Sequence, residues 1–244
     1  MFSYDKAVVE RYPTIRAGII HASRLANGPS SPELLEEYRA EQRVASERLN
    51  ATAIADLPQV AAWRRVFTGF GAKPTQYRNA AEALLRRLAK YGDIPTINTL
   101  VDIGNLVSIR YAMPVAVFDQ ANIAGGSTTV RFATGSEHFT DLGSTDIFYP
   151  DPGEVVFVDG ESVVSARRWC WRQSAQSATS ATTYDALIVV EGHHETASRD
   201  VESALTDLTS LLASHQPQAQ TKSYVLSPKN LRTGTIKGVE NTSG

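Results

Sequence analysis

Three polar side chains lie at helical spacing within an otherwise apolar segment. Asn98, Asp102 and Asn105 are separated by four and three residues, so on a helix they share one face. The residues around them are apolar on nearly every other side, which predicts a buried helix. A buried amide or carboxylate without a partner costs roughly 1–3 kcal/mol. This polar line is therefore expected to bond either to the protein's own backbone or to a ligand.

A second set of candidate residues is basic and could bind phosphate. The run 78–91 has an apolar stripe at helical spacing, and its other face carries Arg78, Glu82 and Arg86. Such a face is typical of a solvated helix with a Glu82–Arg86 pair, worth roughly 0.3–0.5 kcal/mol. The alternative is a phosphate contact, which Lys73 just upstream favours because it adds positive charge.

Arginines and tryptophans alternate in the segment RRWCWRQS at 167–174. Guanidinium groups clamp carboxylates or phosphates, and indole faces accept stacked bases. In an extended conformation Arg168, Cys170 and Arg172 would share one side, which makes that side cationic. The alternative is an amphipathic strand whose tryptophans belong to the core. Cys170, the sole cysteine, is expected to be a packed thiol rather than a nucleophile.

The sequence predicts no metal, cofactor or nucleotide site. A single cysteine excludes an internal disulfide and a cysteine-based metal cage. His193 and His194 are adjacent, so on an extended chain they point to opposite faces. The run Ser136-Glu137-His138 is typical of a polar turn, because a catalytic triad requires convergence that adjacency does not supply. No segment matches the phosphate-binding pattern G-x-x-x-x-G-K-[ST].

Short β-prone runs fill the middle of the chain, and helical runs flank them. Asp159-Gly160 between two of these runs predicts a hairpin turn. Helices are expected over 33–50, after the Ser31-Pro32 start, and over 196–212. This order favours an α+β fold with a central mixed or antiparallel sheet flanked by helices, not a regular βαβ repeat. The expected strands are 15–20, 115–118, 128–133, 154–159, 162–165 and 186–190.

Composition limits the function classes. The chain has 244 residues, 42% of them hydrophobic, enough for one large domain or a main domain with appendages. A net charge of −2 argues against a DNA-binding protein, so any RNA contact must be a local patch. Without a long apolar run or a charged leader, the protein is expected to be soluble and cytoplasmic, with no membrane partner. We expect an accessory region 1–72, a main domain 73–213 and a loosely attached polar tail 214–244.

The segment around the polar line resembles the signature of the B3/B4 domain in the beta subunit of phenylalanyl-tRNA synthetase. There a VVDxTNYV-type helix leads through a proline into a short strand ending in Phe-Asp. Here Val101-Asp102-Ile103-Gly104-Asn105 leads through Pro114 to Phe118-Asp119. The resemblance covers roughly residues 73–213, and three further similar segments follow in order: GGSTTVRFA at 125–133, EVVFVD at 154–159 and DALIVVE at 185–191.

Two other segments are more similar to the free-standing B3/B4 proteins of bacteria than to the synthetase itself. They are KPTQYRNAAEALLRR at 73–87 and RRWCWRQS at 167–174. In the synthetase, this domain hydrolyses wrongly charged tyrosine from phenylalanine tRNA, with an amino-acid pocket beside a groove for the tRNA's acceptor end. The resemblance therefore implies a hydrolase that edits mischarged aminoacyl-tRNA in trans, with tRNA or aminoacyl-tRNA as its partner.

One position departs from the family pattern. The family's strand carries a His before its Phe-Asp, and this chain has Ala116 there. Because that His belongs to the editing pocket, the pocket chemistry or the substrate should differ, and no catalytic residue is carried over. The alternative is a non-catalytic module that binds RNA or a small molecule. The expected pocket groups are Asn79, Asp102, Asn105 and Arg131, and the expected anion contacts are Lys73, Arg78, Arg86, Arg168 and Arg172.

Overall fold

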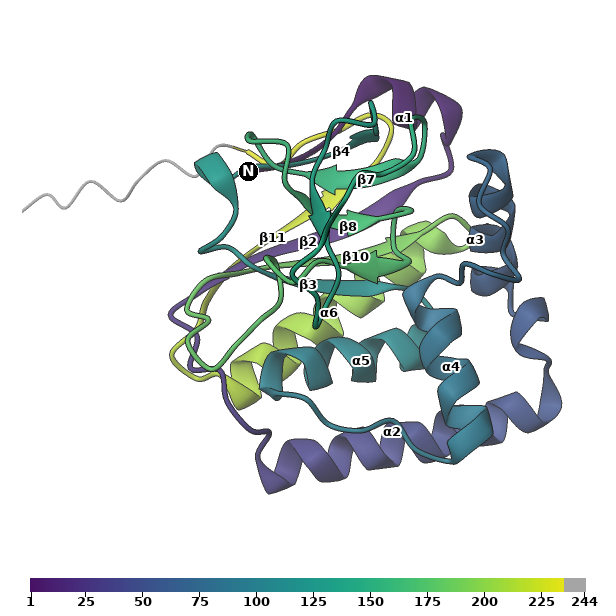
Figure 1. The fold of residues 1–244 in the computed structure, drawn as a ribbon. Coiled ribbons are helices and arrows are strands. Elements are labelled where there is room, and N and C mark those ends of the chain that lie inside the picture. Colours follow the sequence, from purple (N-terminus) through teal and green to yellow (C-terminus); the bar gives the residue numbers. More distant parts are fainter. Residues whose placement is uncertain (235–244) are drawn as a thin grey trace, which may run out of the picture.

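An antiparallel sheet of four strands runs through the middle of the molecule (Figure 1). In the computed structural model, which describes residues 1–234, its strands lie in the order β11-β2-β10-β3. The central strands β2 and β10 are apolar and almost fully buried, as expected of strands covered on both faces. The four strands are β11 (Gln220–Leu226), β2 (Arg16–Ser23), β10 (Ala186–Gly192) and β3 (Val115–Asp119).

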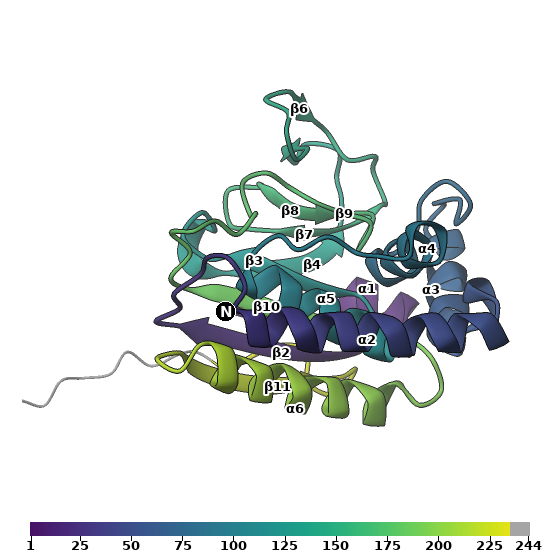
Figure 2. The same ribbon diagram turned by 90° about the horizontal axis from the view of Figure 1, so that it is seen from below.

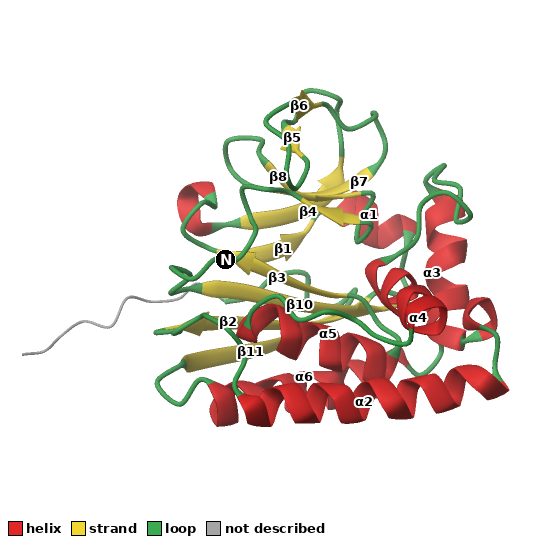
Figure 3. Ribbon diagram, turned by 60° about the horizontal axis from the view of Figure 1, so that its bottom comes forward, coloured by secondary structure: helices red, strands yellow, loops and turns green. Residues whose placement is uncertain are grey.

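A second, five-stranded sheet covers one face of the first, and an apolar cluster fills the space between them (Figure 3). It is mixed, because β1 pairs with β4 in parallel while the other neighbours are antiparallel. A small ribbon projects beyond this sheet and consists of β5 (Phe139–Thr140) and β6 (Ile147–Phe148). The five strands are β1 (Phe2–Tyr4), β4 (Thr128–Phe132), β7 (Val155–Val158), β8 (Val164–Arg167) and β9 (Arg172–Gln173).

Helices form the third layer, on the other face of the four-stranded sheet (Figures 1 and 2). Helices α5 (Thr99–Tyr111) and α6 (Ala197–His215) contact the sheet directly, and α2 (Pro32–Ala51) packs against α5. Figure 2 shows α3 (Pro58–Gly69) and α4 (Ala80–Tyr91) together at one end of α2. The short elements are α1 (Lys6–Arg11) and the 3-10 helices η1 (Ile54–Asp56) and η2 (Ala124–Gly126).

Local sequence signals explain where the helices near the site begin and end. Asn79 and Asn98 precede α4 and α5, and each side chain accepts a hydrogen bond from a backbone N–H in the first turn. Gly92 ends α4 in the left-handed conformation, at φ 78°, which glycine adopts without strain. The predicted helices 33–50, 78–91 and 196–212 and the buried polar-line helix are confirmed to within a few residues.

The α+β class with mixed and antiparallel sheets is confirmed, as is the hairpin between β7 and β8 at Asp159-Gly160. The prediction of a loosely attached tail is wrong over residues 220–226, which form β11 and pair with β2 along its length. Polar side chains misled that prediction, because an edge strand exposes one face to water. No helix among residues 1–234 is long and apolar enough to cross a bilayer.

Candidate functional site

Two adjoining cavities lie beside β3, and four residues line both of them. The inner hollow, of about 70 Å³, lies between the two main sheets and is lined from β3, β7, β8 and β10. The outer cleft, of about 360 Å³, lies between α4, α5 and β3. Because they share a wall, the two cavities form one candidate site. The shared residues are Ala80, Val115, Trp171 and Gln173.

Glu191 is the one carboxylate that lines the inner hollow. It is only 2% exposed, and its Oε1 accepts hydrogen bonds from the Tyr4 hydroxyl at 2.5 Å and the Trp169 indole N–H at 2.8 Å. In the described part of the chain no hydrogen bond reaches Oε2, which leaves that oxygen for a group inside the hollow. Burial raises the pKa of Glu191 to about 7, although these two hydrogen bonds act to lower it.

The strand register explains why Glu191 and Ala116 line the same hollow. Ala116 on β3 is paired with Val189 on β10, and Glu191 follows two residues later on the same strand. Alternation along a strand places residues two apart on the same face, so all three face the five-stranded sheet. The small Ala116 side chain therefore leaves space diagonally beside the Glu191 carboxyl group.

A strained turn between β8 and β9 closes the inner hollow. Arg168 and Trp169 both have positive φ, 43° and 61°, which costs non-glycine residues energy. Tight contacts hold the turn in place: the Trp169 backbone N–H donates to the Val155 carbonyl oxygen at 2.6 Å, and the Trp169 side chain is fully buried. The predicted alternation of residues 168–172 on an extended strand is therefore wrong, because β8 ends at Arg167. The alternative, a core tryptophan, is right for Trp169.

The outer cleft combines one aromatic face with several polar groups. Trp171 is partly exposed, and its ring contacts Tyr77 at a centroid distance of 5.0 Å. Asn105 on α5 and Arg87 on α4 line the same cleft. The Gln173 amide nitrogen donates to the carbonyl oxygens of residues 117 and 177, at 2.9 and 2.8 Å, which fixes its orientation. This arrangement suits a ligand with a stacking ring and hydrogen-bonding groups.

A glycine lets α5 approach β3 at the floor of the outer cleft. A Cβ atom on Gly104 would lie 3.0 Å from a methyl carbon of Val117, closer than ordinary van der Waals contact. The close approach places the next residue, Asn105, at the cavity lining. Gly104 thus has a packing role that positions the cleft.

The structure divides the predicted polar line between packing and the site. Asn98 caps α5, and Asp102 accepts hydrogen bonds from the Ser30 hydroxyl at 2.6 Å and the Ile97 backbone N–H at 2.9 Å. Asp102 is fully buried, and burial raises its pKa. Of the three residues, only Asn105 lines a cavity. Bonding within the protein therefore accounts for Asn98 and Asp102 in and before the first turn of the helix. Of the three residues, Asn105 remains a candidate for bonding to a ligand.

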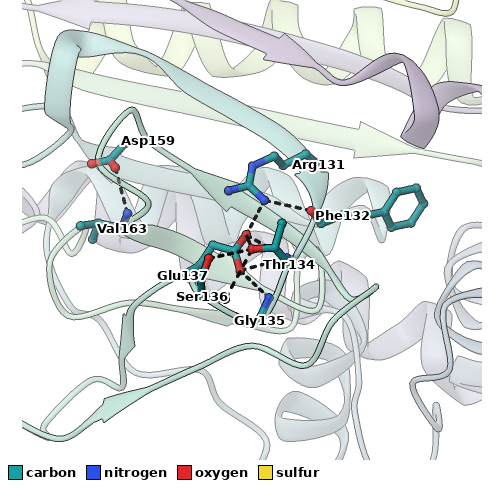
Figure 4. Close-up of polar contacts among 8 residues, drawn as sticks. All are labelled: Arg131, Phe132, Thr134, Gly135, Ser136, Glu137, Asp159 and Val163. Carbon is teal, nitrogen blue, oxygen red and sulfur yellow. Dashed lines mark hydrogen bonds and ion pairs between the residues drawn. The ribbon is translucent and has the colours of Figure 1, made fainter.

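Two other predicted pocket residues lie elsewhere. Asn79 is the capping residue of α4, 2% exposed, and accepts the Glu82 backbone N–H at 3.0 Å. Arg131 on β4 donates to the Glu137 carboxylate and to the Phe132 carbonyl oxygen (Figure 4). Glu137 also accepts backbone N–H bonds from the turn that follows, and these bonds together with Arg131 lower its pKa to about 2 despite its burial. Neither Asn79 nor Arg131 lines the inner hollow or the outer cleft.

The basic face of α4 surrounds a buried carboxylate. Glu82 is 0% exposed, and its Oε1 accepts hydrogen bonds from Arg64 at 2.7 Å and Arg86 at 2.9 Å, with Arg78 at 4.0 Å. The Glu82–Arg86 pair of the solvated-face alternative is thus present. Three guanidinium groups around one carboxylate still leave an excess of positive charge on partly exposed side chains.

The remaining predicted anion contacts lie in the strained turn or near it. Lys73 and Arg168 line a separate cavity of about 270 Å³, where Arg168 also stacks on Tyr77 and pairs with Asp151 at 3.2 Å. Arg172 lines the inner hollow and pairs with Asp141 at 2.6 Å. Of the predicted anion contacts, Arg172 alone lies in the candidate site.

Sequence reasoning missed Glu191, the central group of the site. A charged residue at the end of the apolar run DALIVV was the available signal, because a buried charge needs a partner or a neutral form. Its hydrogen-bond donors, however, come from 22 and 187 residues away in the sequence. Among residues 1–234, no cluster of three or more His, Cys, Asp or Glu side chains could hold a metal ion.

The fold and the cavities define an α+β protein with a candidate ligand site where two sheets meet two helices. The model of the B3/4 domain matches residues 62–215, more than half of the chain. The chain therefore belongs to the B3/4 domain family. The helices α4 and α5 and the strands β3, β7, β8, β9 and β10, which line the site, all lie inside the matched range.

Two sequence relatives are phenylalanine–tRNA ligase beta subunits. The chain is 36% identical over 81 residues to that of Onion yellows phytoplasma (strain OY-M) and 35% identical over 82 residues to that of Geobacter metallireducens. These stretches cover 33% and 34% of this chain but only 10% of each ligase subunit. The chain thus matches about a tenth of the length of these relatives.

Among solved structures, the chain is similar to an N-terminal fragment of the phenylalanyl-tRNA synthetase beta subunit from Pyrococcus horikoshii. The similarity has a TM-score of 0.46 at 12% sequence identity. It covers 91% of this chain and 50% of that chain.

Proposed function

We propose that this protein binds the aminoacylated 3′ end of a tRNA and hydrolyses the ester bond of a mischarged amino acid. The observation that carries the proposal is the pair of adjoining cavities with a shared wall. The family relationship to ligase beta subunits supports a tRNA-linked role. The proposal assigns the terminal nucleoside to the outer cleft and the amino-acid side chain to the inner hollow.

The sizes and linings of the two cavities support this assignment. The outer cleft, at about 360 Å³, is about five times larger than the inner hollow and carries the partly exposed Trp171 ring. Stacking of a base on an aromatic side chain is worth about 1–3 kcal/mol. Asn105 and Arg87 add hydrogen-bond donors beside that ring. The inner hollow is mostly apolar, as an amino-acid side chain requires.

The ester would then lie at the shared wall, between Trp171 and the amide of Gln173. An aminoacyl ester is intrinsically labile, so a positioned water and hydrogen bonds to the carbonyl oxygen suffice for hydrolysis. No dedicated nucleophile is required. The excess positive charge around Glu82 on α4 offers a contact for the tRNA backbone next to the cleft.

A second function has one observation in its favour. Ala116 replaces the family's pocket His, and it lines the inner hollow. A module that kept the cavities without that His would bind an RNA end or a small molecule and release it unchanged. The same experiment separates the two functions.

The test measures release of amino acids from a panel of charged tRNAs, including tyrosine on phenylalanine tRNA, at low salt. The wild-type protein is compared with Asn105→Ala, which alters the outer cleft, and with Asn50→Ala, which removes an exposed amide on α2. We expect Asn105→Ala to lower kcat/KM at least about tenfold, since a hydrogen bond in the transition state contributes about 1.4 kcal/mol. Asn50→Ala should leave it unchanged.

Release that Asn105→Ala reduces and Asn50→Ala does not would support the hydrolase. Salt-sensitive tRNA binding without release from any charged tRNA would leave the binding module. Absence of both release and binding would contradict both functions.

A further inference from the structure

We propose that the small ribbon of β5 and β6 docks onto the C-terminal end of α4 in a second copy of this chain. The inference concerns how the protein assembles, and it goes beyond the proposed hydrolysis, on which it does not depend. Three observations carry it: the exposed apolar tip of the ribbon, the hydrogen-bonded base that holds the ribbon in place, and the opposite charges of the ribbon and of α4.

Large apolar side chains gather on the ribbon. Four of the ten that are exposed among residues 1–234 lie here, each between 45% and 58% exposed. Single apolar side chains are normal on a protein surface, but a group of them marks an interaction site. Because the ribbon projects beyond the five-stranded sheet, its tip can meet a partner without a change in the fold (Figure 3). The four side chains are Leu142, Ile147, Phe148 and Tyr149.

The base of the ribbon is fixed to the body of the protein. The Phe139 side chain is buried, and the Thr140 carbonyl oxygen accepts a hydrogen bond from the Ala175 backbone N–H at 2.9 Å. The hydroxyl oxygen of the same threonine accepts a bond from the Gln176 amide nitrogen at 2.8 Å. A segment that is ordered before binding loses little conformational entropy on docking. The apolar tip is therefore a preformed surface.

The charge of the ribbon favours a protein partner over RNA. Residues 133–166, which include the ribbon, contain seven Asp or Glu and no Lys or Arg. Aromatic rings stack on bases, but carboxylates beside them repel phosphate. On the ribbon Asp146 is exposed, and within the described residues its carboxylate forms no ion pair. The fitting partner is therefore a surface that combines apolar and basic groups.

The C-terminal end of α4 is such a surface on the same chain. The Tyr91 ring is 59% exposed, and the cationic groups of Lys90 and Arg87 lie 4.8 and 5.2 Å from its centroid. In the part of the chain that the structure describes, neither cation pairs with a carboxylate. Residues 58–91, which span α3 and α4, contain seven Lys or Arg and a single acidic residue, the buried Glu82. The ribbon and this helix end are thus complementary in charge, and both are apolar at the centre.

In the proposed contact the aromatic rings of the ribbon pack on Tyr91, and the Asp146 carboxylate pairs with Lys90. Each copy carries one ribbon and one α4 end, so a twofold axis between two copies forms both contacts at once. Opposite charges set this orientation and disfavour docking of ribbon on ribbon, in which carboxylates would face each other. The expected product is a dimer.

Sedimentation equilibrium over a concentration series tests the charged part of the contact. We expect the wild-type chain to dimerise with a Kd below about 100 µM, and Asp146→Lys or Lys90→Asp alone to raise that Kd at least about tenfold. An equimolar mixture of the two variants should restore the dimer, because each of its two contacts again joins opposite charges. Glu161→Lys changes an exposed acid of the same acidic segment outside the ribbon, and as the control it should leave the Kd unchanged.

Phe148→Ser tests the apolar tip, and Tyr184→Ser is its control at another exposed ring. The first variant should raise the dimer Kd at least about tenfold, and the second should not change it. Binding of an RNA hairpin with a single-stranded 3′ end should be the same in both variants as in the wild-type protein.

A monomer at every concentration up to about 100 µM would overturn the inference. A dimer that Lys90→Asp does not weaken, or single variants whose mixture does not dimerise, would also overturn it. Loss of RNA binding in Phe148→Ser with an unchanged dimer Kd would make the ribbon part of the RNA surface and would end the inference as well.

Discussion

Asp102 and Glu191 are buried carboxylates in two different regions of this protein, and their hydrogen bonds are arranged differently. In the first turn of α5, Asp102 has a partner for each oxygen, the Ser30 hydroxyl on one and the Ile97 backbone N–H on the other. Between the sheets, Glu191 accepts both of its hydrogen bonds on one oxygen, and the residue lines a cavity. The comparison teaches that burial of a polar group does not identify a site. An acceptor without a hydrogen-bond partner beside a cavity makes a residue a candidate for ligand binding.

Removal of the Asp102 carboxylate should have the largest effect on stability. Asp102→Ala leaves the Ile97 N–H and the Ser30 hydroxyl without their acceptor, and we expect a loss of about 3 kcal/mol in the free energy of unfolding. Urea unfolding measures it. Asn105→Ala, one turn further along α5, should cost less than about 1 kcal/mol because Asn105 faces the outer cleft. Equal losses for the two variants would break the comparison.

Glu191 should make stability depend on pH. Its pKa is raised from 4.5 to about 7, so from about pH 4.5 upward the unfolded chain ionises while the folded protein keeps its proton. The free energy of unfolding therefore falls as pH rises and levels off above about pH 7, by about 2–3 kcal/mol between pH 5 and 8. Glu191→Gln should remove this fall.

The measured quantity is the difference between the wild-type and Gln proteins at each pH. Burial lowers the pKa of His21 to about 4 and of His193 to about 3, so these histidines add stability as pH rises. They act in both proteins and cancel in the difference. A difference that stays constant from pH 5 to 8 would show that Glu191 is ionised in the folded protein over the whole range.

Trp171, in the wall between the two cavities, allows the role of the outer cleft in RNA binding to be tested. Trp171→Ala removes the stacking face and should weaken binding of an RNA hairpin with a single-stranded 3′ end about tenfold. Tyr184→Ala removes an exposed ring that lines neither cavity and should leave the Kd unchanged. Fluorescence anisotropy at fixed salt distinguishes them, and a similar loss for both would remove the outer cleft from the RNA-binding surface.

The smallest effect is expected at the mouth of the inner hollow. Arg172 is half-exposed and pairs with Asp141, so Arg172→Ala should change stability by less than about 1 kcal/mol. It should lower the slope of log Kd against log salt concentration for RNA by about one, the change expected for the loss of one phosphate contact. Arg43→Ala breaks a more exposed pair with Glu36 on α2 and serves as the control. Identical slopes in both variants would show that Arg172 does not contact phosphate.

Much of the fold could be predicted because its signals are local. The apolar stripe of α4 and the capping side chains before α2, α4 and α5 each act within a few residues. The strands β1 and β11 escaped prediction, since β1 has three residues and β11 is polar on its exposed face. Both exist because a neighbouring strand supplies hydrogen bonds, which no local pattern reports.

The site could be predicted only in part, for the same reason. Asn105 and Arg172 were expected from spacing and composition, and both line the candidate cavities. Asn79 and Arg131 had equally suitable chemistry but found partners in Glu82 and Glu137. A side chain's chemistry makes it a candidate, and its neighbours in space decide whether any of that chemistry remains for a ligand.

The sequence by itself determined the α+β class, the main helices and strands, the buried polar helix and membership of a family marked by short motifs. The tertiary structure alone decided how each buried carboxylate is hydrogen-bonded and which of them lines the candidate site. The hydrogen-bond donors to Asp102 lie 5 and 72 residues away in the sequence, and those to Glu191 lie 22 and 187 residues away. Those partners are set by packing of distant segments, so the chemistry of the site is a property of the folded chain.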